Sequence, residues 1–377
     1  MTLPLYQTHN APKERPITAN AGLWYERFFD QFGYEWQVKD EKTDWLKNNF
    51  NRSTGDAEQL ENYAINQRKM SLALKGEGKV FTTQWHFVTG MGNPHPVENG
   101  MSWHPTLGVP YLTGAAVKGI VRSWLEVWEK ESNDEQQKQK LLNWFGSTSK
   151  NTQEQDYEAL TGSLIFFDAL PIEPVLMNVD IMTPHMGKWY EKGGEIKNHL
   201  KEHDKVPADW HDPVPVPFLV IKKASYLFTF APRNKRTNIQ MEEVLAVLKD
   251  ALDFAGAGAK TAVGYGQMHI NQSESEDLKN QIEKQRYNEK LQSLSEEQQQ
   301  LAELAKMHEQ DKETGNNAPG NPTYQYMIGL IKQSEDWQQA DKEGLADTAE
   351  QIYAFIGWGK GKKKREKKGV IAKLRGE

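Results

Sequence analysis

The chain has 377 residues and carries 46 Lys and Arg against 52 Asp and Glu, a formal net charge of −6 at pH 7. It contains no cysteine, which excludes disulfides, thiolate nucleophiles and iron–sulfur clusters. No apolar run reaches the ~18 residues of a membrane span, and the first residues lack a secretory pattern, so we expect a cytoplasmic protein. The length predicts a main domain with an appendage.

Positive charge is concentrated at the end of the chain. Residues 360–377 contain nine Lys or Arg and two Glu, a net charge of +7, which leaves −13 for the rest. A run such as KGKKKREKK is ordinarily a solvated face. As a polyphosphate contact it would bind in a salt-dependent and sequence-blind way.

Residues 1–79 are predicted to be helical, because AGLWYERFFDQFGYEW places its apolar residues near helical spacing. A turn at KGEG precedes a predicted strand, QWHFVTG, at residues 84–90. A long loop rich in Gly, Pro and Asn follows. Thr113 can then cap a helix that carries apolar residues on one face as far as Trp128.

The central part of the chain continues with two predicted strands, SLIFFDALP and PVLMNVDIM, and a predicted hairpin, PFLVIKK with SYLFTFA. The amphipathic helix MEEVLAVLKDALDFA leads into GAGAKTAVGYGQ and a last strand. The order β, α, β, β, α, β predicts an α+β domain of the ferredoxin-like, RRM-like kind over residues 80–270. The helices before it are insertions, and a helical extension follows it.

The extension divides into three predicted segments. Residues 271–310 are a charged helix whose apolar seam is broken by Gln298, which favours a helix packed on a body over a coiled coil. Residues 311–323 are predicted to be a flexible linker. Residues 324–377 are a helical segment that ends in the basic tail.

The glycine-rich loop of residues 255–266 is the first candidate binding site. It is neither a Walker A motif nor a GxGxxG motif, because Ala259 and Thr261 occupy required glycine positions. Its four glycines would let the backbone approach a phosphate, while Lys260 adds charge and Thr261 a hydroxyl donor. The alternative is a helix C-cap followed by a tight turn.

A second candidate lies on the helix after Thr113. Lys118 and Arg122 are four residues apart and therefore share one helix face. Cations near a helix N-terminus oppose its dipole unless an anion compensates. The alternative is a solvated face on which Arg122 pairs with Glu126.

The sequence gives only weak evidence for a metal site or for acid–base catalysis. The HLKEH segment at residues 199–203 has the form of an inverted zinc-protease motif, but its flanks are polar and glycine-rich, so we predict no zinc. Asp168 and Asp180 could share a metal only if their strands were adjacent. A loop histidine such as His95, His104 or His185 could be a general base for RNA cleavage, although structural roles are commoner.

Four segments, GNPHPVENG, FFDALP, DIMTPH and GAGAKTAVGYG, occur in this order between about residues 80 and 270. Together they resemble the RAMP superfamily of CRISPR effector proteins, and most of all its sixth-subunit family from type III-B (Cmr) complexes. The resemblance implies an RRM-like fold and a subunit that caps the crRNA 3′-side end of a helical ribonucleoprotein. It implies crRNA, target RNA and other Cmr backbone subunits as partners, in antiviral defence.

The resemblance also implies a non-catalytic protein, and because the residues form no convincing metal or cofactor motif, we expect neither a metal nor a cofactor. The residues that we assign to RNA binding are Asn93, His95, Lys118, Arg122, His185, Gly256, Gly258, Lys260, Thr261 and Gly264. One alternative is a metal-independent RAMP-type endoribonuclease that processes guide-RNA precursors. Another is a protein-interaction scaffold with no RNA affinity.

Overall fold

The computed structural model describes residues 12, 14–38, 41–128, 134–147, 160–203, 205–208, 210–234 and 239–377. Every helix in these ranges is too short or too polar to cross a bilayer. The chain divides into two compact units, Met1–Lys279 and Asn280–Glu377. The boundary falls within helix α8 (Gln272–Gln292).

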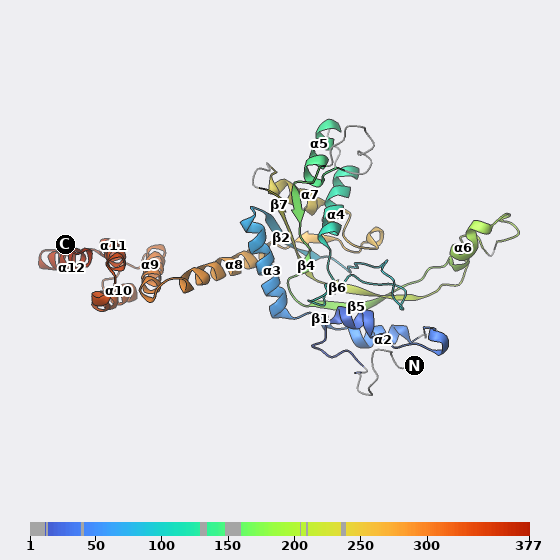
Figure 1. Cartoon of the computed structure of the whole chain (residues 1–377), viewed down its shortest axis with the longest axis horizontal. Helices are drawn as coiled ribbons and strands as arrows, with labels where there is room; N and C mark the ends of the chain where they lie inside the picture. The colour runs from blue at the N-terminus through green and yellow to red at the C-terminus, as the bar shows by residue number, and fades with distance from the viewer. Residues whose placement is uncertain are drawn as a thin grey trace. The chain divides into compact units, whose positions relative to one another are not determined.

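The first unit is built on an antiparallel sheet with the strand order β3-β7-β2-β8 (Figure 1). The strands are β2 (Glu77–Thr83), β3 (Leu164–Phe166), β7 (Ser225–Pro232) and β8 (Met268–Ile270), and β4 (Leu170–Pro171) also pairs with β7. Helix α4 (Gly114–Val127) connects β2 to β3, and α7 (Met241–Phe254) connects β7 to β8. The order β2-α4-β3-β7-α7-β8 is the ferredoxin-like α+β arrangement, so the predicted fold class is confirmed.

The two connecting helices, α4 and α7, form where the sequence analysis predicted them. The Thr113 hydroxyl accepts a hydrogen bond from the Ala116 N–H at 3.2 Å and caps α4. Val117, Val121 and Leu125 of α4 are buried, and α4 packs against α7. This packing is what brings the start of α4 close to the loop that follows α7.

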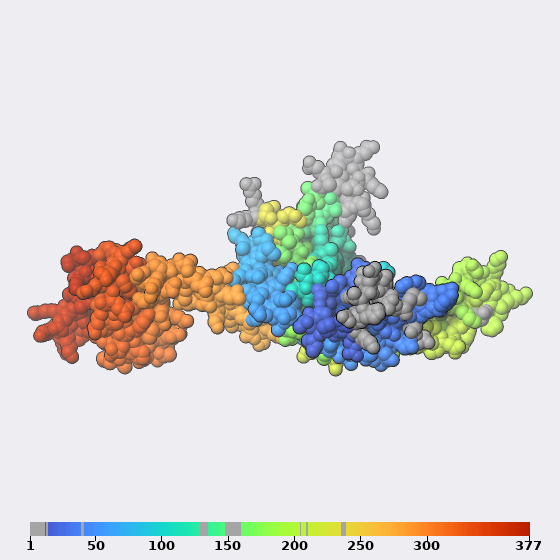
Figure 2. Space-filling model, turned by 60° about the horizontal axis from the view of Figure 1, so that its bottom comes forward, coloured from blue at the N-terminus to red at the C-terminus, as the bar shows by residue number. Residues whose placement is uncertain are grey.

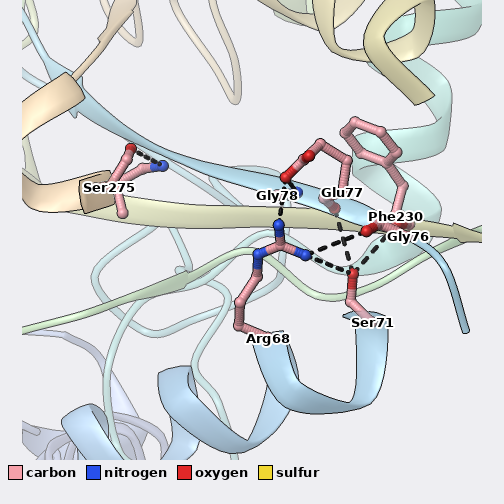
Figure 3. Close-up of polar contacts among 8 residues, drawn as sticks. Arg68, Ser71, Gly76, Glu77, Gly78, Phe230 and Ser275 are labelled. Atoms are coloured by element: carbon pink, nitrogen blue, oxygen red, sulfur yellow. Dashed lines mark hydrogen bonds and ion pairs between the residues drawn. The ribbon is translucent and has the colours of Figure 1, made fainter. Parts of the chain in front are cut away.

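Helix α3 (Ala57–Ala73) is fastened to the start of β2 by side-chain hydrogen bonds (Figure 3). Figure 3 shows Arg68 and Ser71 pointing at the segment that contains Gly76 and Glu77. Arg68 forms an ion pair with Glu77 and donates to the Gly76 carbonyl at 3.2 Å. A Cβ on Gly76 would overlap the Phe230 carbonyl oxygen, so glycine is needed for this close approach.

A second sheet in the first unit has the order β1-β5-β6. Its strands are β1 (Ser53–Thr54), β5 (Val175–Met182) and β6 (Val216–Lys223). The predicted hairpin between PFLVIKK and SYLFTFA is therefore wrong, because β6 pairs with β5 while β7 pairs with β2 and β3. Ala224 alone separates these two strands, so the chain passes directly from one sheet to the other.

Two other predicted elements differ from the structure. Residues 84–90 are not a regular strand but an irregular segment with one strand-like bridge, between Phe87 and Ile221. The strand is instead β2, which includes part of the predicted KGEG turn, and the turn itself lies at Lys75, with φ of 61°. SLIFFDALP forms β3 and β4, two short strands with a break between them.

The predicted N-terminal helix is shorter than its apolar spacing indicated. It divides into α1 (Ala21–Arg27) and a 3₁₀ turn, η1 (Tyr34–Trp36), and is followed by α2 (Lys42–Phe50). Tyr25 and Trp45 are buried in an aromatic core, whereas Leu23 is exposed. Figure 2 shows the blue residues of these N-terminal helices on the face of the first unit turned toward the viewer.

Among the described residues, the first unit also contains the helices α5 (Asp134–Phe145) and α6 (Gly187–Lys192) and two 3₁₀ turns, η3 (Gly193–Glu195) and η4 (Thr261–Val263). Residues 183–215, which include α6 and η3, connect β5 to β6, and we call them the arm. The HLKEH segment lies in the arm and is exposed.

The second unit has a core of its own. Its helices are α9 (Glu296–Thr314), α10 (Pro322–Gln333), η5 (Ser334–Asp336), α11 (Gln339–Ile356) and α12 (Lys362–Arg375). The predicted single helix over 271–310 is interrupted between α8 and α9, where Ser295 caps α9. In place of a loose linker, Asn321 donates to Asp311 at 2.7 Å and to the Asn316 carbonyl at 3.0 Å.

Candidate nucleic-acid interface

The glycine-rich loop begins where α7 ends and returns the chain to β8. Gly256, Gly258, Gly264 and Gly266 all have positive φ, between 72° and 92°, a conformation that side chains with a Cβ rarely adopt. A Cβ on Gly258 would overlap the Val88 carbonyl oxygen, and one on Gly266 would overlap that of Ala257. Gly264 faces open space. Most of these glycines are therefore needed for the packing of the loop against the rest of the protein, whether or not a ligand binds there.

Hydrogen-bond donors remain free in the middle of this loop. The Ala259 N–H donates to the Val88 carbonyl at 2.8 Å, and the Gly266 N–H to the His86 carbonyl at 2.8 Å. Among the described residues, the N–H groups of Lys260, Thr261 and Ala262 donate no hydrogen bond. Three successive unpaired N–H groups are donors that an anion can satisfy.

Lys260 lies at the centre of the loop in the left-handed conformation, with φ of 60°. Its ammonium lies 5.2 Å from the ring centroid of Phe218 and 3.8 Å from the sulfur of Met182. It forms no ion pair with any residue that the structure describes. Its charge is therefore held in place by an aromatic ring and is not neutralised by a carboxylate.

A cleft of about 580 Å³ lies between the glycine-rich loop, one face of α4 and the segment after β2. Its lining includes Gly256, Gly258 and Thr261 from the predicted site. The remaining walls are hydroxyl, glycine and apolar residues, with Trp124 and Trp128 among them, and no acidic or basic side chain among the described residues lines it. An anion entering this cleft would meet backbone and hydroxyl donors without like-charge repulsion.

The structure places Lys118 and Arg122 on another face of α4. Gly119 and Ser123 line the cleft, and each lies about 100° around the helix from the residue before it. Lys118 donates to the Phe145 carbonyl at 3.1 Å, and Arg122 pairs with Glu126 at 2.7 Å. Burial, followed by repulsion from neighbouring arginines, lowers the pKa of Lys118.

His95 is packed against the N-terminal aromatic core. Its ring stacks on Tyr25 with centroids 3.9 Å apart. Its Nε2 lies 2.7 Å from the Tyr25 carbonyl, and its Nδ1 accepts from the Val97 N–H at 3.2 Å. Because a carbonyl requires a donor and an N–H an acceptor, these partners fix the neutral tautomer protonated at Nε2. Burial lowers the pKa of His95, although the hydrogen bond to Tyr25 opposes the shift.

The other predicted residues are dispersed. Asn93 is exposed beside the cleft-lining Gly92, and its side chain makes no hydrogen bond among the described residues. His185 lies at the start of the arm, where its Nδ1 is 3.1 Å from the His211 carbonyl. Of the ten predicted residues, Gly256, Gly258 and Thr261 line the cleft, and Lys260 and Gly264 belong to the same loop without lining it. The other five do not line the cleft.

Neither aspartate lies in a metal site. Asp168 accepts from the Gly114 N–H at 2.6 Å, at the start of α4, while Asp180 belongs to β5 in the other sheet. The described residues contain no group of three His, Asp or Glu that could hold a metal ion.

One cluster beside the glycine-rich loop was not predicted. Asp180 accepts hydrogen bonds from the Tyr265 hydroxyl and from the Ile181 N–H, and its Oδ2 lies 3.2 Å from the Nδ1 of His86. Burial alone would raise the pKa of Asp180, but these hydrogen bonds outweigh it and hold the pKa below its ordinary value. Trp85 stacks on His86. About ninety residues of sequence separate Asp180 from His86 and from Tyr265, so no local spacing could have indicated the cluster.

The ferredoxin-like fold and the glycine-rich loop after its last helix are the two features to compare with known protein families. Residues 80–269 match the model of the RAMP superfamily, and the chain belongs to that superfamily. It is 27% identical over 239 residues to the CRISPR system Cmr subunit Cmr6 of Pyrococcus furiosus, and 25% identical over 182 residues to that of Saccharolobus solfataricus. These matches cover 50% and 47% of this chain, and 66% and 50% of the two relatives.

Solved structures of related proteins are similar over part of the chain. The cryo-EM structure of the Type III-B Cmr-beta bound to cognate target RNA matches with a TM-score of 0.44 and 21% identity, and the match covers 62% of this chain and 70% of that one. The crystal structure of Cmr6 from Pyrococcus furiosus matches with a TM-score of 0.30 and 26% identity, and the match covers 52% and 97% of the two chains.

Proposed function

We propose that this protein is an RNA-binding structural subunit of a type III-B CRISPR ribonucleoprotein. In this role it caps the crRNA 3′-side end of the backbone filament and contacts guide RNA, target RNA and the neighbouring Cmr subunits, in antiviral defence. Its membership of the RAMP superfamily and its similarity to two Cmr6 subunits support the proposal.

The observation that carries the RNA-binding part is the glycine-rich loop with its cleft. The loop carries unpaired N–H groups and the unneutralised Lys260, and its Thr261 lines the cleft, where no acidic side chain among the described residues lies. Such donors bind the sugar–phosphate backbone of any sequence. Sequence selection then comes from base pairing with the guide, for which the protein needs no base-specific contacts.

The test is purification of the tagged chain from its host, followed by sequencing of bound RNA and identification of co-eluting proteins. An untagged host strain provides the control. We expect a small RNA of defined length together with other RAMP proteins. Recovery of the chain alone, without RNA or partners, would overturn the proposal.

The same proposal makes the chain non-catalytic. We expect it to cut neither single-stranded RNA nor single-stranded DNA, with or without Mg²⁺ or Mn²⁺. The hydrogen bonds of His95 occupy both ring nitrogens, so the ring cannot accept a proton from a ribose hydroxyl without breaking its packing.

One observation favours the endoribonuclease as a second candidate. Asp180 orients His86 through Nδ1, and the Nε2 of His86 has no partner among the described residues, an arrangement that suits a general base. The side chain is only 15% exposed and lies against Trp85, which limits access to it. Incubation of the wild-type chain, His86→Ala and His95→Ala with repeat RNA decides the question. Cleavage that is lost in either variant would establish the nuclease.

A further inference from the structure

We propose that Trp85 is a stacking platform for an unpaired RNA base, at a site beside the glycine-rich loop. The inference rests on the proposed RNA-binding function and adds to it a contact that recognises the flat face of a base instead of a phosphate. Four separate parts of the first unit build the platform: the segment after β2, β5, β6 and the glycine-rich loop.

The indole contacts two aromatic neighbours and stays half exposed. His86 lies parallel to it, with ring centroids 5.0 Å apart and an interplanar angle of 14°. Tyr265 lies 4.9 Å from Trp85 and 5.6 Å from His86, nearly perpendicular to both rings. The three centroid distances are nearly equal, so Tyr265 does not lie directly opposite His86 across the indole. Trp85 remains 50% exposed, which leaves aromatic surface open to a base.

The platform is rigid before any ligand arrives. The Gln84 N–H donates to the Gln267 carbonyl at 2.8 Å, and the Gly266 N–H donates to the His86 carbonyl at 2.8 Å, so the backbone is held on both sides of Trp85. The rings beneath are held in turn by Asp180, which bonds both His86 and Tyr265. Because little side-chain freedom remains to be lost, stacking at this position costs little conformational entropy.

The surroundings favour a nucleotide whose base lies on Trp85 and whose phosphate lies toward the loop. The lowered pKa of Asp180 keeps it anionic at neutral pH, so a phosphate is repelled from the His86 side. Lys260 offers a positive charge beside the same aromatic group, since its ammonium is over Phe218 and Phe218 lies 6.4 Å from Tyr265. A flat apolar face beside an unpaired cation is the combination that binds single-stranded nucleic acid.

The experiment measures binding of the full-length chain to a short fluorescein-labelled single-stranded RNA by anisotropy. Trp85→Leu keeps an apolar side chain but removes the aromatic face, and we expect it to weaken binding about tenfold. Trp85→Phe should recover most of the affinity. The matched control is Trp36→Leu, since Trp36 is also in the first unit and is 51% exposed, and it should bind as the wild type does.

A second ligand separates base stacking from phosphate binding. An abasic form of the same RNA retains the phosphates, so Trp85→Leu should bind it as well as the wild type does. Equal losses on intact and abasic RNA would overturn the stacking role, as would a Trp85→Phe variant that binds as weakly as Trp85→Leu.

The remaining outcomes are distinguishable. If the wild-type chain binds neither RNA, the proposed function itself fails and the platform fails with it. If the wild type binds RNA and Trp85→Leu binds it equally, only the platform is overturned. Retained RNA affinity with loss of co-purifying subunits would assign Trp85 to a protein contact and overturn the inference in the same way.

Discussion

His95 lies where one backbone carbonyl and one backbone N–H each occupy a ring nitrogen, and Tyr25 covers its face. A protonated ring could not accept from Val97, so protonation disrupts this packing. Burial holds the pKa of His95 below the ordinary value of about 6.5, so the folded state binds the proton less readily than the unfolded chain. The stability that this confers is present above about pH 6.5 and is lost as the pH falls through the folded pKa.

We therefore predict that the urea midpoint of the wild type decreases between about pH 7.5 and about pH 5.5. His95→Gln should be less stable at neutral pH but should show a smaller decrease over this interval. Part of the decrease should remain, because burial also lowers the pKa of His104. An unchanged pH dependence in His95→Gln would contradict the tautomer assigned to His95.

Lys260 provides the second prediction at the residue scale. Its charge has no carboxylate partner among the described residues, so Lys260→Ala should weaken RNA binding similarly for all sequences and lower the salt slope by about 1. Lys249→Ala is the charge-matched control, since Lys249 is paired with Asp253 at 2.8 Å on α7. If RNA affinity depended on salt concentration equally in the two variants, Lys260 would not contact a phosphate.

The glycines of the same loop need a different comparison. Gly258→Asp would collide with the Val88 carbonyl oxygen, so it would lower stability whether or not RNA binds there. Gly264 has positive φ but open space around it, so Gly264→Asp and Gly264→Asn should cost similar stability. Only the aspartate should weaken RNA binding further, because it adds a negative charge near the phosphate.

At the scale of elements, α4 has two functions on two faces. The face with Gly119 and Ser123 lines the cleft, while Lys118 donates to the carbonyl of Phe145, the last residue of α5. We predict that Lys118→Ala lowers the free energy of unfolding by about 1 kcal/mol and leaves RNA affinity unchanged. Lys118→Met, which keeps the aliphatic stem, separates packing from the hydrogen bond. A loss of RNA affinity without a loss of stability would put this face of α4 in the interface.

The elements that could be predicted from the sequence are those in which buried and exposed residues alternate with a regular spacing. Helices α4 and α7 each carry one apolar face, and both were found within a few residues of their observed ends. Strands β6 and β7 are buried on both sides for most of their length, so no alternation indicates a partner, and they were wrongly paired with each other. Residues 84–90 are apolar enough for a strand, yet their backbone bonds to several different segments and forms only one strand-like bridge, between Phe87 and Ile221.

Only the part of the candidate site that is continuous in the sequence could be predicted from it. The glycine-rich loop is continuous in sequence, and its composition indicates its conformation. The cluster of Trp85, His86, Asp180 and Tyr265 depends on which strands are neighbours, and sequence periodicity does not carry that information. Similarly, the face of α4 that lines the cleft depends on the position of α7, and not on the charges of Lys118 and Arg122.

At the scale of the whole molecule, the basic tail belongs to the folded second unit. Ile371 and Leu374 of α12 are buried in its core, so deleting residues 360–377 would uncover that core. The cations at the start of α12 are different: Lys363, Lys364, Arg365 and Lys368 are exposed and form no ion pair among the described residues. Lys363, Lys364 and Arg365 lie in the first turn of α12, where positive charge also opposes the helix dipole.

We predict that replacing these four residues with Gln leaves the second unit folded and weakens RNA binding most at low salt. The salt slope should fall by up to about 3, since each phosphate contact with a single strand contributes about 0.7. The control is Arg375→Gln, which removes a cation that Asp347 and Glu350 already neutralise. An unchanged salt slope in the fourfold variant would show that the tail only solubilises the chain.

Ala224 lies between two strands of different sheets and is clamped to the end of β2, since its carbonyl accepts from the Thr83 N–H at 3.0 Å and its N–H donates to the Thr83 hydroxyl at 3.1 Å. Adding one residue here would invert the faces of β6 or β7, and neither strand has a face that tolerates water. The arm, which joins the other end of β6 to β5, imposes no such constraint on length. New segments can therefore be inserted into the arm. The one-residue link at Ala224, by contrast, fixes the register of β6 in one sheet relative to β7 in the other.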